Sequence, residues 1–321
     1  MKMKEPRLKR SDTKKVSGFT KRFQRDWQLH LLISIPLIYL IIFHYVPIYG
    51  AQIAFRDYRA RRGIWGSEWV GLKWFKQFLG DFRFGEILTN TVVLSIYNTL
   101  LCFVLAVMLA LLLNSLRSEK IKKFTQTITY IPHFISVVVL VSMFQQIFNP
   151  INGLYGTLHR LFGGTGYPED FRGLAGAFRH IYVLTTLWQQ LGWQTIIYTS
   201  ALSSVDPGQH EAAIIDGATR WQRLRYIDWP GLVPTACTML ILNFGNIMSV
   251  GFEKVYLLQG VLNRETSEVI STYVYKVGMG SGADFSYGAA IGLFNSVVNC
   301  ALLIFVNWLT KKLSADEMGL F

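Results

Sequence analysis

Charged residues are absent from six long stretches of this 321-residue chain, and this segregation limits its fold more than any other feature. Together the six stretches cover 171 residues, so all 52 charged side chains fall in the other 150. A charge at the centre of a bilayer costs roughly 2.5–3.5 kcal/mol, and about 20 apolar residues cross the hydrocarbon as a helix. The pattern therefore predicts an all-α membrane protein with six transmembrane helices. The spans are expected at about 28–50, 87–114, 124–148, 180–204, 231–252 and 286–310.

The distribution of basic residues predicts the orientation of these spans. Residues 1–26 hold ten Lys or Arg and no apolar face, which is typical of a cytoplasmic tail under the positive-inside rule. The competing interpretation, a signal peptide, lacks a small-residue cleavage site after the apolar stretch. Six spans then place 19 basic residues inside and 13 outside. We expect a basic tail at 1–26, a six-span domain at 27–321, and both termini in the cytoplasm.

Several classes of protein are excluded by the residues present. The basic residues are scattered rather than gathered in one stripe, so we expect no nucleic-acid partner. The three cysteines lie inside the charge-free stretches and the six histidines are dispersed, so no metal site is predicted. Neither a phosphate-binding loop nor a nucleophile elbow occurs. The chain is therefore not expected to be an enzyme or to hold a cofactor, and another chain would hydrolyse any ATP.

The loops on the predicted outer side have distinct compositions. The first, near 56–86, interleaves basic and aromatic residues, and Leu72, Phe75 and Leu79 recur at helical spacing. We expect residues 67–79 to form an amphipathic helix, either in the outer headgroup region or as a packed cap over the helices. The glycine-rich segment 149–179 predicts a loop with at most short helical pieces.

A structured loop is predicted between the fourth and fifth spans, at residues 206–230. Asp206 can cap a helix, Pro207 fits its first position, and Gly217 supplies the turn at which it stops. A second helix with three arginines should follow and end at Pro230. The loop is too charged and too short to cross the membrane, so we interpret it as a docking element on the cytoplasmic face.

The residues of this loop are similar to a known signature. Glu-Ala-Ala at 211–213 precedes a glycine at the sixth position after the Glu, then nine residues, an isoleucine and, three positions on, a proline. This spacing resembles the EAA signature of importer-type ABC permeases, and only Trp229 departs, where the family usually has leucine. The runs at 216–218, 188–193 and 66–72 extend the resemblance to the carbohydrate-uptake permeases of the LplB and YteP type, over nearly the whole chain.

The resemblance implies the type I ABC importer permease fold, called MetI-like, with the loop forming coupling helices in a groove of the ATP-binding subunit. There the glutamate can pair with a basic residue, the alanines permit close approach, and the glycine sets the angle between helices. Closure of the ATPase dimer would rotate the attached spans and alternately expose a midplane site. The implied coupling residues are Glu211, Ala212, Ala213, Asp216, Gly217, Ala218, Ile227 and Pro230.

Polar side chains in two spans predict where a substrate binds. Amides can bond sugar hydroxyls and indole rings can stack on sugar rings. The resemblance places the family's substrate sites on these same spans. The alternative is that the amides only tie helices together. The predicted substrate residues are Thr186, Trp188, Gln189, Gln190, Trp193, Gln194, Asn243 and Asn246.

The leading hypothesis is a permease subunit of an oligosaccharide importer in the cell membrane. It implies a second homologous permease, usually a different chain, two ATP-binding subunits that use ATP and Mg, and an extracytoplasmic solute-binding lipoprotein. The first outer loop carries seven basic and four acidic residues, and this positive charge favours uronate-containing sugars of the pectin or alginate type. Neutral sugars remain the alternative substrates. The alternatives are an ABC permease for another small solute, a non-ABC carrier, and a receptor or scaffold without transport.

Overall fold

The computed structural model describes residues 25–280 and 282–313, so nearly all of the predicted tail 1–26 lies outside the described residues. Helices supply almost all of the regular structure. The strands of the described part are β1, Arg56–Asp57, and β2, Glu68–Trp69, which pair antiparallel. The chain divides into two compact units, residues 1–52 and 53–321, and each is described by itself.

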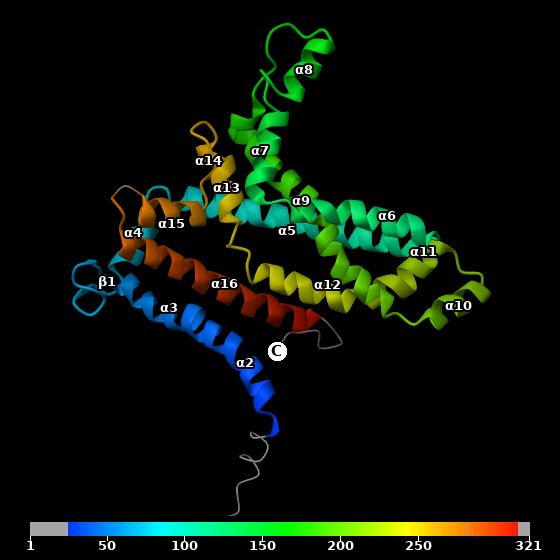
Figure 1. Ribbon diagram of the computed structural model, residues 1–321, viewed down its shortest axis with the longest axis horizontal. Coiled ribbons are helices and arrows are strands. Elements are labelled where there is room, and N and C mark those ends of the chain that lie inside the picture. The colour runs from blue at the N-terminus through cyan, green and yellow to red at the C-terminus, as the bar shows by residue number, and fades with distance from the viewer. Residues whose placement is uncertain (1–24, 281, 314–321) are drawn as a thin grey trace, which may run out of the picture. The chain divides into compact units, whose positions relative to one another are not determined.

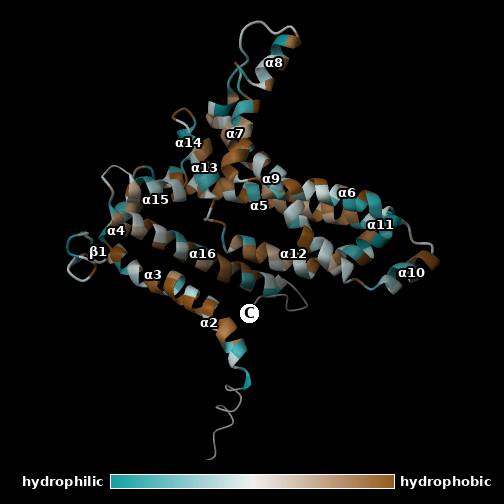
Figure 2. Cartoon of the chain, viewed as in Figure 1, coloured by the Kyte–Doolittle hydropathy of each residue, from teal (hydrophilic) through white to brown (hydrophobic). Residues whose placement is uncertain are grey.

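The first unit is an apolar helical segment. It contains α2, Trp27–Leu40, the π-helical turn η1, Ile41–Tyr45, and α3, Val46–Ile48. Pro36 lies inside α2 without ending it, and none of the residues of these three elements is buried by other parts of the chain. Figure 2 shows hydrophobic residues along most of its length. A helix that is apolar on every side is typical of contact with lipid.

The second unit contains the remaining helices, whose arrangement can be followed in Figure 1. Helix α9 lies against α5, and α15 lies against α16. The helices are α4, Lys73–Leu79; α5, Phe84–Ser115; α6, Glu119–Tyr130; α7, Val137–Ile147; α8, Leu154–Leu161; α9, Ala175–Ser203; α10, Pro207–Ile215; α11, Arg220–Arg223; α12, Trp229–Phe244; α13, Phe252–Leu258; α14, Arg264–Ser267; α15, Ile270–Met279; and α16, Phe285–Leu313.

Length and composition mark three described helices as able to cross a membrane. They are Trp27–Phe55, Phe84–Ser115 and Phe285–Lys312, and a bent pair formed by α6 with its 3₁₀ extension and α7 makes a fourth. The other two predicted spans coincide with α9, which is rich in polar residues, and with α12. Helix α12 ends at Phe244, before the predicted end of its span at 252, and the helical residues that precede it include the charged Arg225 and Asp228. The count of six therefore remains a prediction.

The predicted third span, 124–148, is not one straight helix. Pro132 lies in a 3₁₀ turn, Ile131–Phe134, and the chain bends by 98° between this turn and α7, at residues 135–136. Proline lacks the backbone donor that would continue the α-helix, which explains why α6 gives way to a 3₁₀ turn, and Ser136 then caps the start of α7. The glycine-rich segment 149–179 contains short helical pieces, as expected: α8 and the 3₁₀ turn Phe171–Gly173.

The prediction of an amphipathic helix at 67–79 is wrong in its length. Residues 68–69 form β2, and α4 begins only at Lys73. Leu72 and Leu79 are more than half exposed, whereas Trp74 and Phe78 are buried against α15 and α16. The ring of Phe78 lies 5.5 Å from that of Phe294, centroid to centroid. Pairing of β2 with β1 keeps residues 68–69 out of a helix, so α4 begins only after them.

Helix α9 packs very closely on α6 at Gly192. A Cβ atom on this buried residue would clash with the backbone oxygen of Thr129 and would lie 2.9 Å from Cδ1 of Tyr130. By contrast, a Cβ on Gly176, in the first turn of the same helix, would meet nothing within 4 Å. The absence of a side chain at Gly192 is therefore what allows the two backbones to approach.

We expect Gly192→Ala to destabilise the chain by about 2 kcal/mol, because the added methyl group meets a carbonyl that cannot rotate away. Gly176→Ala is the matched control. It should be neutral or stabilising by up to about 1 kcal/mol, because alanine favours the helix and fills open space. Thermal unfolding of both variants in detergent tests this, and equal melting temperatures would contradict the proposed close packing.

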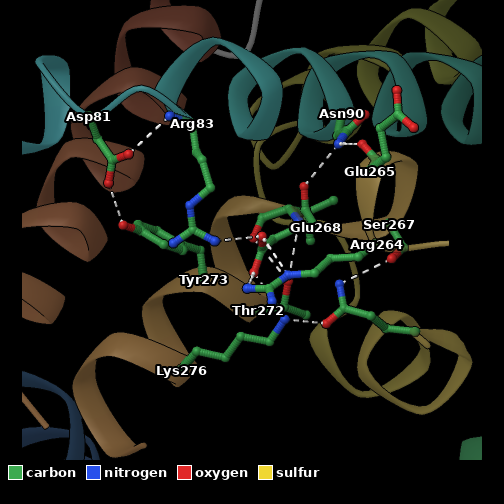
Figure 3. A network of polar contacts seen from close by, with 12 residues as sticks. Asp81, Arg83, Asn90, Arg264, Glu265, Ser267, Glu268, Thr272, Tyr273 and Lys276 are labelled. Atoms are coloured by element: carbon green, nitrogen blue, oxygen red, sulfur yellow. Dashed lines mark hydrogen bonds and ion pairs between the residues drawn. The ribbon is translucent and has the colours of Figure 1, made fainter. Parts of the chain in front are cut away.

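A polar network joins α5 to α14 and α15 (Figure 3). Glu268 is only 1% exposed and its carboxylate contacts Arg83 at 3.1 Å, Arg264 at 3.2 Å and Lys276 at 2.9 Å. Asn90 of α5 donates to the backbone oxygens of Glu265 and Glu268. Three cations around one carboxylate hold the beginning of α5 against the segment that follows α13.

Candidate functional site

The loop 206–230 begins with the helix predicted from its caps. The side chain of Asp206 accepts a hydrogen bond from the backbone nitrogen of Gly208 at 2.9 Å, and Pro207 occupies the first turn of α10. At the start of α11, the backbone nitrogen of Thr219 donates to the side chain of Gln222 at 2.7 Å, and its hydroxyl accepts from the Gln222 nitrogen at 3.3 Å. The N-termini of both helices are thus capped by local side chains, and such caps stabilise short helices.

Gly217 supplies the turn between α10 and α11, as predicted. Its φ is +78°, in the left-handed region that residues with a Cβ rarely adopt. Its nitrogen donates to Ile214 at 3.1 Å, and the nitrogen of Ala218 donates to Ala213 at 2.8 Å. These bonds satisfy the last carbonyls of α10 and fix the direction in which α11 leaves.

The prediction that the second helix ends at Pro230 is wrong. After α11 the backbone forms a π-helical turn, η5, Leu224–Asp228, and continues into α12 with Pro230 in its first turn. A π-turn widens the helix ahead of the proline, where an α-helical carbonyl would otherwise clash with the ring. Helix α12 is therefore continuous with the loop.

The outward side of α10 is exposed and chemically mixed. Glu211, Ala212 and Asp216 are exposed, and Ile215 is 85% exposed. Glu211 has no hydrogen bond or ion pair with any described residue. An unpaired carboxylate beside exposed aliphatic groups marks an interaction site. We call these four residues the α10 surface. Of the other predicted coupling residues, Ala213, Ala218 and Ile227 are half-buried, and Pro230 is exposed.

A buried carboxylate connects α10 to the helices behind it. Asp228, 6% exposed, contacts Nε2 of His210 at 3.3 Å and accepts from Nδ2 of Asn114 at 3.0 Å. Burial raises the pKa of Asp228, although His210, Asn114 and Arg223 oppose that effect. The same groups line a cavity of about 290 Å³. Sequence reasoning missed this link because Asn114 and Asp228 are 114 positions apart.

The predicted substrate residues of α9 do not share one direction. Gln190 and Trp193 face His133, whose Nδ1 lies 2.9 Å from Oε1 of Gln190 and whose ring stacks on that of Trp193 with centroids 4.1 Å apart. Thr186 and Gln189 face α13 instead, and the amide nitrogen of Gln189 donates to the backbone oxygen of Ile135 at 2.8 Å. These four residues of α9 therefore contact two different neighbours, the 3₁₀ turn that contains His133 and helix α13.

The other predicted substrate residues lie apart from this group. Trp188 is 53% exposed and lines a largely apolar hollow of about 610 Å³ between α7 and α9. Gln194 is half-buried, and Asn243 is exposed. Asn246 lines a small polar cavity and donates to the backbone oxygen of Leu242. The assignment of any of these residues to a substrate stays a prediction.

Lys254 is a residue that sequence reasoning missed. It is 5% exposed, and its Nζ donates to Thr186 Oγ1 at 3.1 Å and Gln189 Oε1 at 3.0 Å. It follows the charge-free stretch 229–252 by two positions, so the charge pattern assigns it to an outer loop. In the structure its ammonium group reaches the middle of α9.

The fold agrees with comparisons to known proteins. Residues 102–315 match the family described as "binding-protein-dependent transport system inner membrane component". Two relatives come from Bacillus subtilis (strain 168). Protein LplB is 40% identical over 93% of this chain and 92% of its own length, and the polygalacturonan/rhamnogalacturonan transport system permease protein YteP is 41% identical over 90% and 89%.

Two solved structures share the fold. One is a bacterial ABC transporter involved in the import of the acidic polysaccharide alginate, with a TM-score of 0.83, 32% identity, and 93% of this chain and 100% of that chain covered. The other is a bacterial alginate ABC transporter in complex with an alginate pentasaccharide-bound periplasmic protein, with a TM-score of 0.81, 33% identity, and coverage of 92% and 98%. This chain therefore belongs to the binding-protein-dependent transport system inner membrane components, a family of membrane transport proteins and not of enzymes.

Proposed function

We propose that this chain is the transmembrane permease subunit of an ABC importer that takes up oligosaccharides from an extracytoplasmic binding protein. The observation that carries the proposal is the α10 surface, a rigid exposed helix with an unpaired Glu211, held at the end of a fold shared with an alginate importer. Such a helix is suited to a groove in an ATPase subunit. Asp228 then links the helix to α5 through Asn114, so that movement of α10 is passed to a long helix.

The proposed partners follow from this arrangement. They are a second homologous permease, two ATP-binding subunits that supply ATP and Mg, and a solute-binding lipoprotein on the outer face. Co-purification of this chain with the products of co-expressed transport genes tests the assembly. Recovery of the chain without any ATP-binding subunit, from cells that contain all of them, would contradict it.

We infer that the substrates are acidic oligosaccharides. The name of YteP refers to polygalacturonan and rhamnogalacturonan, and the solved importers carry alginate, all of which contain uronate groups. The first outer loop of this chain carries seven basic and four acidic residues, which gives a local positive field. Uptake of labelled oligogalacturonide in competition with neutral gluco- and xylo-oligosaccharides tests the inference. Preference for the neutral sugars at low ionic strength would contradict it.

The proposed location is the cell membrane with both termini in the cytoplasm. In a variant without the three native cysteines, we expect Thr165→Cys, in the exposed glycine-rich segment, to react with an impermeant thiol reagent applied from outside. Ser204→Cys, beside α10, is the matched control and should react only after the cells are opened. A reporter fused after residue 321 should be cytoplasmic. The reversed labelling pattern would show that the orientation is wrong.

A further inference from the structure

Lys254 carries a positive charge into the interior of the described fold, beside the middle of α9. Its ammonium group is held by two neutral oxygens, Thr186 Oγ1 and Gln189 Oε1, and lies 6.0 Å from the centroid of the Tyr182 ring. Helix α13 itself packs on α7 and α9. The charge is therefore enclosed by protein and has little contact with solvent.

This charge has no anionic partner among residues 25–280 and 282–313. No carboxylate of these residues forms an ion pair with Lys254. By contrast, Nζ of Lys276 in α15 lies 2.9 Å from the carboxylate of Glu268. A buried ammonium without a carboxylate is costly, because neutral oxygens replace only part of its hydration. The described residues do not offset the free-energy cost of burying this ammonium group. A buried charge of this kind in a membrane protein indicates a role in binding a ligand.

Tyr182, which lies next to Lys254, also lines a small polar cavity of about 70 Å³. Hydroxyl and amide groups of Ser95 and Asn98 from α5, and of Asn246 and Ser249 from the non-helical segment after α12, line it. The hydroxyl of Ser95 is buried and has no hydrogen-bond partner. An unpaired buried hydroxyl within a long helix, beside the break between α12 and α13, is typical of a transporter's binding region.

We propose that Lys254, with Thr186 and Gln189, binds one carboxylate of an acidic oligosaccharide as it passes through the importer. The inference rests on the proposed function and names the group in this chain that would select acidic sugars. The ammonium would form a charge-assisted hydrogen bond with the carboxylate, and the neighbouring hydroxyl and amide groups would bond sugar hydroxyls.

The structure holds this site closed. A cavity of about 70 Å³ is much smaller than the roughly 300–1,000 Å³ of ligand pockets, so a sugar ring requires the helices to separate. Helix α13 has seven residues and is flanked by non-helical residues 249–251 and 259–263. These connections allow α13 to move from α9 as one piece and to present Lys254 to the opened path.

The experiment is a double-mutant-type cycle. One change removes the positive charge of Lys254, and the other removes the negative charge of the substrate carboxylate. The complete importer, with its binding protein, is reconstituted in proteoliposomes with wild-type chain or Lys254→Met, and uptake of a galacturonate oligosaccharide is compared with that of its methyl ester. The binding protein is identical in both importers, so its own preference cancels in the cycle. Lys76→Met, which removes an exposed charge from α4, controls for general steering.

We expect Lys254→Met to lower uptake of the acidic sugar about tenfold and uptake of the ester less than about twofold. Lys76→Met, which removes one basic charge from the first outer loop, should lower uptake of the acidic sugar much less than Lys254→Met does. Unchanged uptake of the acidic sugar, or an equal loss for both sugars, would overturn the assignment of Lys254. Failure of the wild-type importer to take up either sugar would instead contradict the proposed function. If Lys254→Met does not assemble, Lys254→Gln, which keeps a donor without the charge, provides the same comparison.

Discussion

Glu211→Lys is expected to abolish uptake while the chain still reaches the membrane. The substitution reverses the charge on the α10 surface and touches no predicted span, and Glu211 supports no other described residue through a hydrogen bond or ion pair. Loss of the ATPase contact would leave transport without its energy source. Pull-down of the ATP-binding subunit and sugar-stimulated ATP hydrolysis are the measurements.

Gln209→Lys is the matched control for this prediction. It adds a positive charge to the same helix, two residues away and therefore about 200° around the axis from Glu211. We expect this variant to retain the ATPase and most of its uptake. If Glu211→Lys assembles normally and hydrolyses ATP in response to sugar, the coupling role of the α10 surface is wrong.

Glu268→Gln is expected to destabilise the chain by about 3 kcal/mol, because Arg83, Arg264 and Lys276 then converge on a neutral group. Glu265→Gln, the same substitution at an exposed position in α14, is the matched control and should stay within about 0.5 kcal/mol of wild type. Thermal unfolding in detergent compares them. Equal stability of the two variants would show that the network does not hold α5 to α15.

The same carboxylate predicts a dependence on pH. Burial raises the pKa of Glu268, but hydrogen bonds from Arg264 and Lys276 and their charges outweigh burial, so its pKa lies below the ordinary value. Its contribution is fully present above the ordinary carboxyl pKa of about 4.3 and is lost as the pH falls through the lower, folded-state value. The stability gap between wild type and Glu268→Gln should therefore close in acid. A gap that persists there would contradict the ionised state.

Local signals in the sequence were sufficient to predict the helix caps, the turn after α10 and the apolar helices. Asp206, Pro207 and Gly217 each act on backbone groups within a few positions, so their pattern predicts the α10 turn correctly. The signature at 211–213 depends on the same short range and identifies the family. Charge-free stretches likewise predict where the apolar helices are, because insertion in a bilayer depends on composition over about 20 residues.

Features that depend on distant contacts were not predictable in this way. The pairing of β1 with β2 fixes where α4 begins, and no periodicity within 67–79 encodes that pairing. From the sequence, Lys254 is assigned to a loop, because its burial depends on the packing of α13 against α9. The partners of Asp228 and Glu268 lie as far as 114 and 185 positions away. One sequence without its three-dimensional contacts cannot identify such pairs.

The π-turn at Leu224–Asp228 holds one more residue than an α-helical turn would. The wider turn absorbs this residue locally, so its deletion should restore α-helical winding and leave the direction of α10 nearly unchanged. Within a regular α-helix each residue advances the backbone by about 100° and 1.5 Å. Deletion of one residue from the α-helical part of α12 should therefore swing α11 and α10 around the helix axis by about that angle and point Glu211 at a different neighbour. Homologous permeases could then differ by one residue in the π-turn and still fit the same partner, whereas a difference of one residue within α12 would make them incompatible.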